Sequence, residues 1–118
     1  MIWQRLIKKA LDPFGVSHAQ FVIMATLLWF RSHGYTSAQV DIINWTNLDP
    51  MTVSKSLKKL TLDGYVERVE HKTDARAKEV SLTGKGIKLV EQLVPIVEGV
   101  DADFFASSPS ARKLKEVL

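Results

Sequence analysis

The stretch FVIMATLLWF at residues 21–30 constrains the fold most, because it would be apolar on almost every side of a helix. A membrane-spanning helix needs roughly 20 such residues, about twice the length of this stretch. A shorter helix that is apolar all round has to be covered by other parts of its own protein. We therefore expect a buried central helix, around which the rest of a globular domain packs.

The composition is compatible with one such domain. The chain has 118 residues, of which 46% are apolar, and no repeat, low-complexity tract or linker divides residues 1–118. It has no cysteine, which excludes disulfides, thiolate metal sites and thiol redox switches within this sequence. Basic residues interrupt the first 14 positions, unlike a signal peptide. We expect a cytoplasmic protein with no membrane segment.

The first two helices are predicted from apolar spacing and from the residues that would end them. Residues 2–11 carry one apolar stripe at helical spacing, formed by Trp3, Leu6, Ile7 and Ala10. The sequence DPFGV then breaks this helix. Ser17 suits the N-cap of the second helix, and Gly34 suits the left-handed turn that ends it.

A short third helix is predicted at residues 38–45, with Thr36 or Ser37 as its cap. Its inward-facing side chains are expected to be Val40, Ile42, Ile43 and Trp45. Asn47 follows, a residue that tolerates the positive φ of a tight turn.

Asp49 and Pro50 predict the start of a fourth helix, at residues 50–62, because Asp caps exposed amides and Pro has a helical φ. Its apolar stripe consists of Val53, Leu57 and Leu60. The other sides carry Thr52, Ser54, Lys55, Lys58 and Lys59. This helix therefore has a polar and basic outer face.

Two strands, at residues 65–69 and 78–82, are expected to pair as an antiparallel ribbon across the loop HKTDARA. Thr83 and Gly84 then open a last long helix, with an apolar seam of Val90, Leu93, Val97, Val100 and Phe104. Leu89, Ile96 and Phe105 lie outside that seam. The helix thus has apolar faces for two partners, which indicates a homodimer; a wide core face in a monomer is the alternative.

Positive charge is concentrated in the middle of the chain. The net charge is only +3, but residues 55–88 hold nine basic and five acidic residues. The predicted order of helix, turn, basic helix and ribbon is that of a winged helix-turn-helix, which places a helix in the major groove of DNA. We therefore predict a mainly α fold with a small antiparallel β-ribbon.

Three segments follow one another along nearly the whole chain: VSHAQFVIMATL, TVSKSLKKLTLDGYVER and DARAKEVSLTGKG. In this order they resemble the MarR (multiple antibiotic resistance regulator) family of winged-helix transcription factors. The resemblance implies a DNA-binding lobe at residues 17–86 and dimerisation helices at residues 1–14 and 86–118. It also implies a homodimeric regulator, expected to be a repressor, that binds a pseudo-palindromic double-stranded operator.

The family's wing sequence Asp-x-Arg corresponds to Asp74 and Arg76, within a wing at residues 70–79. The resemblance implies that Arg76 enters the minor groove while Asp74 supports it; a plain polar turn is the alternative. Further DNA contacts are expected from Ser37, Thr52, Ser54, Lys55, Lys58 and Lys72. For Ser37 a simple helix cap, and for Lys58 a solvated helix face, are the alternatives.

Many members of the family bind a small-molecule effector between the dimerisation helices and the DNA-binding lobe. The residues expected near such a crevice are His18, Phe21, Met24 and Trp29, and simple core packing is their alternative role. No phosphate-binding loop, nucleophile elbow or metal-ligand spacing is found, so neither an enzyme nor a cofactor or metal site is expected. A winged-helix module that binds protein instead of DNA is the competing function.

Overall fold

The apolar stretch of residues 21–30 lies inside α2 (His18–Ser32) of the computed structural model, which describes residues 2–70 and 78–107. Ser17 caps this helix as predicted: its Oγ accepts a hydrogen bond from the Gln20 amide at 3.1 Å, and Gln20 Oε1 accepts one from the Ser17 amide at 2.9 Å. Ile23 and Met24 are fully buried. Because α2 packs against α3, α4, α5 and β2, it is the centre of the fold.

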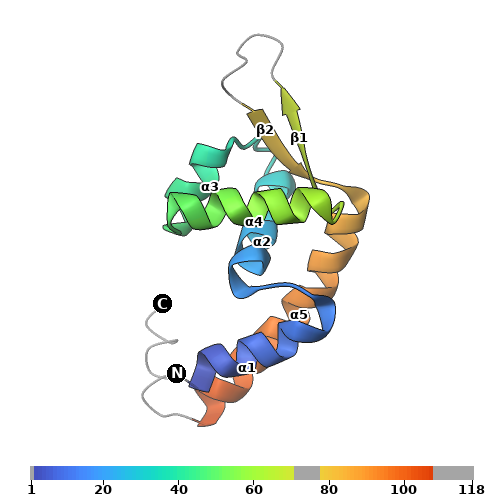
Figure 1. Cartoon of the computed structure of the whole chain (residues 1–118). Coiled ribbons are helices and arrows are strands. Elements are labelled where there is room, and N and C mark those ends of the chain that lie inside the picture. Colours follow the sequence, from blue (N-terminus) through green and yellow to red (C-terminus); the bar gives the residue numbers. More distant parts are fainter. Residues whose placement is uncertain (1, 71–77, 108–118) are drawn as a thin grey trace.

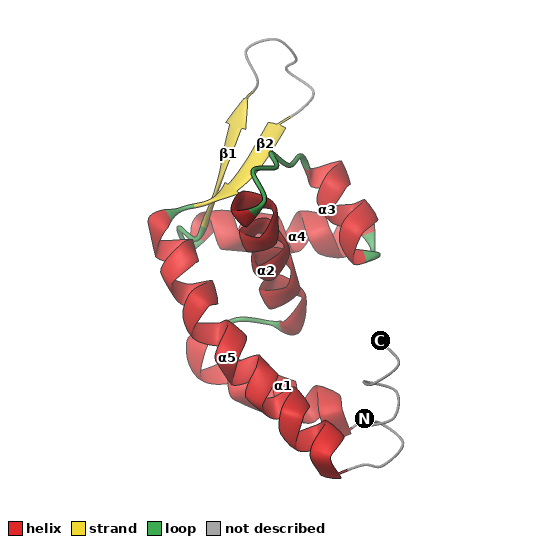
Figure 2. Ribbon diagram, turned by 180° about the vertical axis from the view of Figure 1, so that it is seen from behind, coloured by secondary structure: helices red, strands yellow, loops and turns green. Residues whose placement is uncertain are grey.

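The remaining elements follow the predicted order, and the mainly α fold with a small antiparallel ribbon is confirmed. They are α1 (Ile2–Leu11), the short 3-10 helix η1 (Asp12–Phe14), α3 (Gln39–Thr46), α4 (Pro50–Leu62), β1 (Val66–Glu70), β2 (Lys78–Leu82) and α5 (Gly84–Ser107). The strands stand at one end of the molecule and α1 lies at the other, with α2, α3 and α4 between them (Figures 1 and 2).

The cap of α3 differs from the prediction. The N-cap is Ala38, whose backbone N–H donates to Asp41 Oδ2 at 2.8 Å, so neither Thr36 nor Ser37 caps this helix. Ser37 is instead buried, and its hydroxyl donates to the Val80 carbonyl oxygen at 3.2 Å. The serine therefore ties the start of α3 to β2.

The inward face of α3 is also narrower than predicted. Ile42 is fully buried and Ile43 partly so, but Val40 is 57% exposed and Trp45 is 55% exposed. Val40 lies two residues before Ile42, which places it about 200° around the helix, on the opposite side. The tight turn that ends α3 is as expected, because Asn47 adopts a φ of 56°, in the left-handed region.

The two strands pair in the register Val66↔Leu82 to Glu70↔Lys78. The segment before α3 joins them, through an isolated bridge between Ala38 and Glu79 and a 2.8 Å hydrogen bond from the Val80 amide to the Ser37 carbonyl. The sequence did not predict this third, very short segment of strand pairing. It ties the start of α3 to β2 at the base of the ribbon.

Helix α5 begins where the chain leaves the ribbon, and Gly86 is essential to its position. A Cβ added at Gly86 would lie 2.0 Å from the Tyr65 carbonyl oxygen, so only glycine fits there. Thr83 Oγ1 accepts a hydrogen bond from the Gly86 amide at 3.1 Å and donates to the Gly64 carbonyl oxygen at 2.6 Å. These contacts lock the start of α5 against the end of α4.

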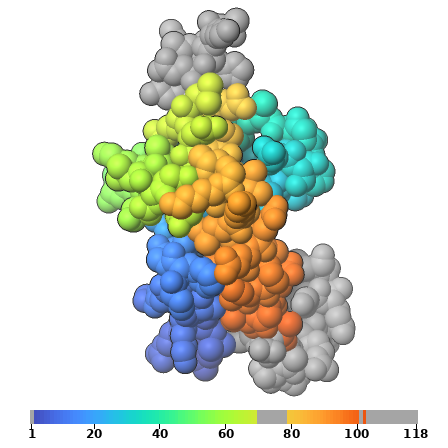
Figure 3. All heavy atoms as spheres, turned by 90° about the vertical axis from the view of Figure 1, so that its right-hand side faces the viewer, coloured from blue at the N-terminus to red at the C-terminus, as the bar shows by residue number. Residues whose placement is uncertain are grey.

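The far part of α5 lies along α1, where the orange and blue surfaces run side by side (Figure 3). Of the predicted seam, Val90 and Leu93 are fully buried and Val97 is nearly so, whereas Val100 is only partly buried. The side chains of Phe104 and Phe105 lie outside what the structure describes. On α1, Ile7 and Leu11 are buried, but Leu6 is 40% exposed. The predicted stripe on α1 is therefore only partly covered.

Within the described ranges, no single helix has the length and apolar character needed to cross a bilayer. Residues Ile2–Phe14 and His18–Ser32 meet those requirements only when taken together, and they are joined by a 77° bend.

Candidate nucleic-acid interface

Helix α4 separates an apolar inner face from a polar outer face, as its sequence predicts. Val53, Leu57 and Leu60 are at most 1% exposed. Ser54, Lys55 and Lys58 are exposed on the outer side. The three outer residues can therefore reach a partner without any change in the core.

Thr52 and Lys59, near the two ends of α4, pair with the residues that cap this helix. Asp49 Oδ2 accepts from the Thr52 amide at 3.0 Å and lies 3.4 Å from the Thr52 hydroxyl, so Thr52 is part of the N-cap. At the other end, Lys59 Nζ lies 3.1 Å from Asp63 Oδ1. Lys55 and Lys58 form no ion pair with any residue that the structure describes. Their charges remain available to an anionic ligand.

Ser37 is placed differently from the other predicted contact residues. Its side chain is only 4% exposed, and its hydroxyl is used by Val80. The hydroxyl is therefore not presented to a phosphate. Its effect on an interface would be indirect, since it holds α3 against β2.

The predicted wing contacts Lys72, Asp74 and Arg76 lie outside the described residues. The strands on either side are described, and their last pair is Glu70↔Lys78. Because β1 packs against α4, the ribbon and the basic helix are direct neighbours (Figure 1). That is the arrangement of a helix and a wing that act on the same duplex.

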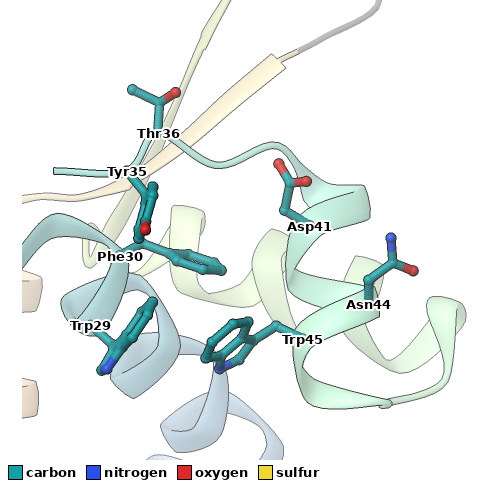
Figure 4. Close-up of a pocket in the computed structure, with 7 residues that line it drawn as sticks. All are labelled: Trp29, Phe30, Tyr35, Thr36, Asp41, Asn44 and Trp45. Atoms are coloured by element: carbon teal, nitrogen blue, oxygen red, sulfur yellow. The ribbon is translucent and has the colours of Figure 1, made fainter. Parts of the chain in front are cut away.

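The sequence did not predict an open pocket of about 420 Å³ between α2, the α2–α3 loop and α3 (Figure 4). It is lined by Trp29, Phe30, Tyr35, Thr36, Asp41, Asn44 and Trp45. These residues come from three segments, and no local spacing links them. Only the packing of α3 on α2 brings them together.

The four residues expected at an effector crevice do not share one pocket. Trp29 lines the pocket beside α3, whereas His18 lines a separate depression next to α1 and η1. Phe21 and Met24 belong to the buried core. Core packing, the alternative role, is therefore correct for these two.

Among the described residues, no group of three His, Cys, Asp or Glu side chains is arranged to hold a metal ion.

A family model described as "ArnR1-like, winged-helix domain" matches residues 12–99. The uncharacterized HTH-type transcriptional regulator YdcH of Bacillus subtilis is 35% identical over 106 residues, which cover 90% of this chain and 72% of YdcH. The match spans a smaller share of other curated relatives. For the HTH-type regulator PrsX of Escherichia coli, which is 27% identical over 88 residues, it covers 74% of this chain and 51% of PrsX.

Solved structures share the fold. The Bordetella bronchiseptica protein BpsR, in a study of how 6-hydroxynicotinic acid regulates its DNA binding, superposes with a TM-score of 0.82 at 25% identity, covering 98% of this chain and 80% of BpsR. A mutant of MarR from E. coli, complexed with operator DNA, has a TM-score of 0.77 at 23% identity, covering 98% of this chain and 85% of that one.

Proposed function

This chain belongs to the ArnR1-like winged-helix family and is a MarR-type helix-turn-helix transcriptional regulator, and from that premise we propose that it binds operator DNA as a homodimer. The expectation that it is not an enzyme is confirmed by its relatives, which are transcriptional regulators. They give no support to the alternative of a protein-binding module.

The observation that carries this proposal is the outer face of α4. Lys55 and Lys58 are exposed on α4, the helix that packs against β1, and neither is neutralised by a described acidic residue. An α-helix fits the major groove, which is about 12 Å wide. We propose that Ser54 and Lys55 meet base edges while Lys58 meets a phosphate. Thr52 supports them by fixing the first turn of α4.

The wing at residues 70–79 completes the proposed interface. Lys72 would lie along the phosphate backbone, and Arg76 would enter the minor groove, whose negative potential attracts a guanidinium group. Asp74 would orient Arg76 through a charge-assisted hydrogen bond. Ser37 contributes indirectly, since it connects α3 to the strand that leaves the wing.

The proposed homodimer forms through α1 and α5, where Ile2 is 70% exposed and Leu6 is 40% exposed. Its two identical subunits, related by twofold symmetry, would contact half-sites about one helical turn apart, so the operator would be a pseudo-palindrome. We propose that occupation of such a site in the cytoplasm excludes other DNA-binding proteins, so that the regulator acts as a repressor. A small-molecule effector is also part of this proposal, by analogy with BpsR and its 6-hydroxynicotinic acid.

A matched pair of lysine variants tests the proposal. Binding sites are first selected from a genomic DNA pool, and the salt dependence of binding to a selected site is then measured. Lys58→Ala should weaken binding to all sequences and lower the slope of log K against log salt by about 1. Lys59→Ala, on the same helix but paired with Asp63, should change that slope less. Failure to select any duplex would refute the function.

A further inference from the structure

Three aromatic side chains lie next to one another on the surface beside α3, instead of in the core. Tyr35 is 59% exposed, Trp45 is 55% exposed and Trp29 is 38% exposed. Trp29 has its ring centroid 4.7 Å from that of Trp45 and 5.9 Å from that of Tyr35. Large exposed aromatic surfaces are uncommon on a soluble domain and mark binding sites.

The rings pack against one another and against their neighbours. The buried ring of Phe30 lies 5.4 Å from Trp45 and meets it edge-on. On Trp29 the ring of His33 is stacked at 4.0 Å, and His33 Nδ1 lies 2.8 Å from the Trp29 carbonyl oxygen. Figure 4 shows Trp29, Tyr35 and Trp45 around one opening. A ligand would meet a largely preformed surface.

The chemistry of the lining favours positive charge. Among the described residues that line it, Asp41 is the only carboxylate and none is Lys, Arg or His. The carboxylate is held in place, because Asp41 Oδ2 accepts the Ala38 amide at 2.8 Å. Aromatic faces carry negative potential and attract cations. Asn44 and Thr36 add neutral polar groups at the edge.

From this combination we propose that the pocket formed by Trp29, Tyr35, Trp45 and Asp41 binds a lipophilic organic cation. The aromatic rings contact its apolar substituents and attract its charge, while Asp41 neutralises that charge at the rim. The whole chain has a net charge of +3, so non-specific attraction would favour anions instead. A preference for a cation would therefore not be explained by the net charge of the chain.

The test uses two probes of nearly the same size and shape but opposite charge, tetraphenylphosphonium and tetraphenylborate. Binding to the full chain is measured by isothermal titration calorimetry without DNA, so the result does not depend on the proposed function. We expect saturable binding of one tetraphenylphosphonium per chain and weaker binding of tetraphenylborate. Equal binding of the two ions, or no binding of the cation, would overturn the proposal.

Three substitutions locate the binding. Trp45→Ala should weaken tetraphenylphosphonium binding about tenfold, through the loss of one cation–π partner and its contact area. Asp41→Asn keeps an oxygen that can accept the Ala38 amide. It should weaken the binding of tetraphenylphosphonium severalfold without weakening the binding of tetraphenylborate. Leu62→Ala removes a 79% exposed apolar side chain outside the pocket and should have no effect. Unchanged affinity in Trp45→Ala, with an unaltered melting temperature, would place the binding elsewhere.

Discussion

In α4, every apolar residue of the predicted stripe is buried by its own chain, whereas in α1 the predicted stripe is only partly covered. Val53, Leu57 and Leu60 are at most 1% exposed, but Leu6 is 40% exposed. The lobe, by which we mean α2, α3, α4 and the two strands, therefore covers the apolar stripe of its basic helix. The stalk, by which we mean α1 and η1 together with the described part of α5 beyond Leu89, leaves part of its predicted stripe exposed.

The difference shows which apolar stripe is covered within one subunit and which is left available to a partner. Burial of apolar surface stabilises a fold by about 25 cal/mol per Å², and an exposed apolar side chain leaves that free energy unused. In the stripe of α4 it is already gained within one subunit. In the stalk, Ile2 and Leu6 would gain it only against a second copy.

The largest expected effect is on the core of the lobe. Leu57→Ala should lower the free energy of unfolding by about 2 to 5 kcal/mol, because it removes a fully buried side chain and leaves a cavity. Leu62→Ala, the same change on the same helix at a 79% exposed position, should stay within about 0.5 kcal/mol. Urea unfolding of both variants measures this. Similar losses in the two would show that the lobe core is not closed as described.

The next effect concerns the junction between the lobe and the stalk. Gly86→Ala should destabilise the protein by about 1 to 3 kcal/mol or more, because the new Cβ would overlap the Tyr65 carbonyl oxygen. Gly84→Ala, two residues earlier on the same helix, meets nothing within 4 Å. It should be neutral or stabilising by up to about 1 kcal/mol. Thermal unfolding distinguishes them, and a stable Gly86→Ala protein would contradict the close approach.

A charge on the stalk tests whether the exposed stripe is an interface. Leu6→Lys should raise the dissociation constant of the dimer at least about tenfold, or about 1.4 kcal/mol, because a charge would be placed in an apolar contact. Gln4→Lys adds the same charge at an exposed position of α1 and should have less effect. Sedimentation equilibrium gives both constants. A wild-type chain that stays monomeric at every concentration would exclude the proposed dimer.

Much of the fold was predictable because its determinants are local. Ser17 and Asp49 cap α2 and α4, and Asn47 takes the left-handed turn between α3 and α4. The helical period also identified Lys55 and Lys58 as outward-facing. Each of these features depends on residues within a few positions of one another, so the sequence contains them directly.

The errors and omissions involve contacts between distant residues. The hydrogen bond from Ser37 to Val80 spans 43 positions, and it removes a hydroxyl that the sequence assigned to a cap or to DNA. Trp45 was expected inside, but α3 packs through Ile42 and leaves the indole against Trp29. Tertiary packing decides such contacts, and no local spacing indicates them. The roles of Lys72, Asp74 and Arg76 stay predictions, because these residues lie outside the described ranges.

The smallest effect should be the same in both regions. Lys8 and Asp12 in the stalk lie 3.0 Å apart, and Lys59 and Asp63 in the lobe lie 3.1 Å apart; both pairs join positions i and i+4 on a helix surface. Such exposed pairs contribute only about 0.3 to 0.5 kcal/mol, because water and salt screen them.

Lys8→Ala and Lys59→Ala should therefore each lower the free energy of unfolding by less than about 0.5 kcal/mol, and the loss should shrink further in 1 M salt. Urea unfolding at low and high salt measures both. A much larger loss for Lys8→Ala would mean that charge, as well as apolar contact, holds the stalk together. Equal small losses would leave apolar burial as the property in which the lobe and the stalk differ.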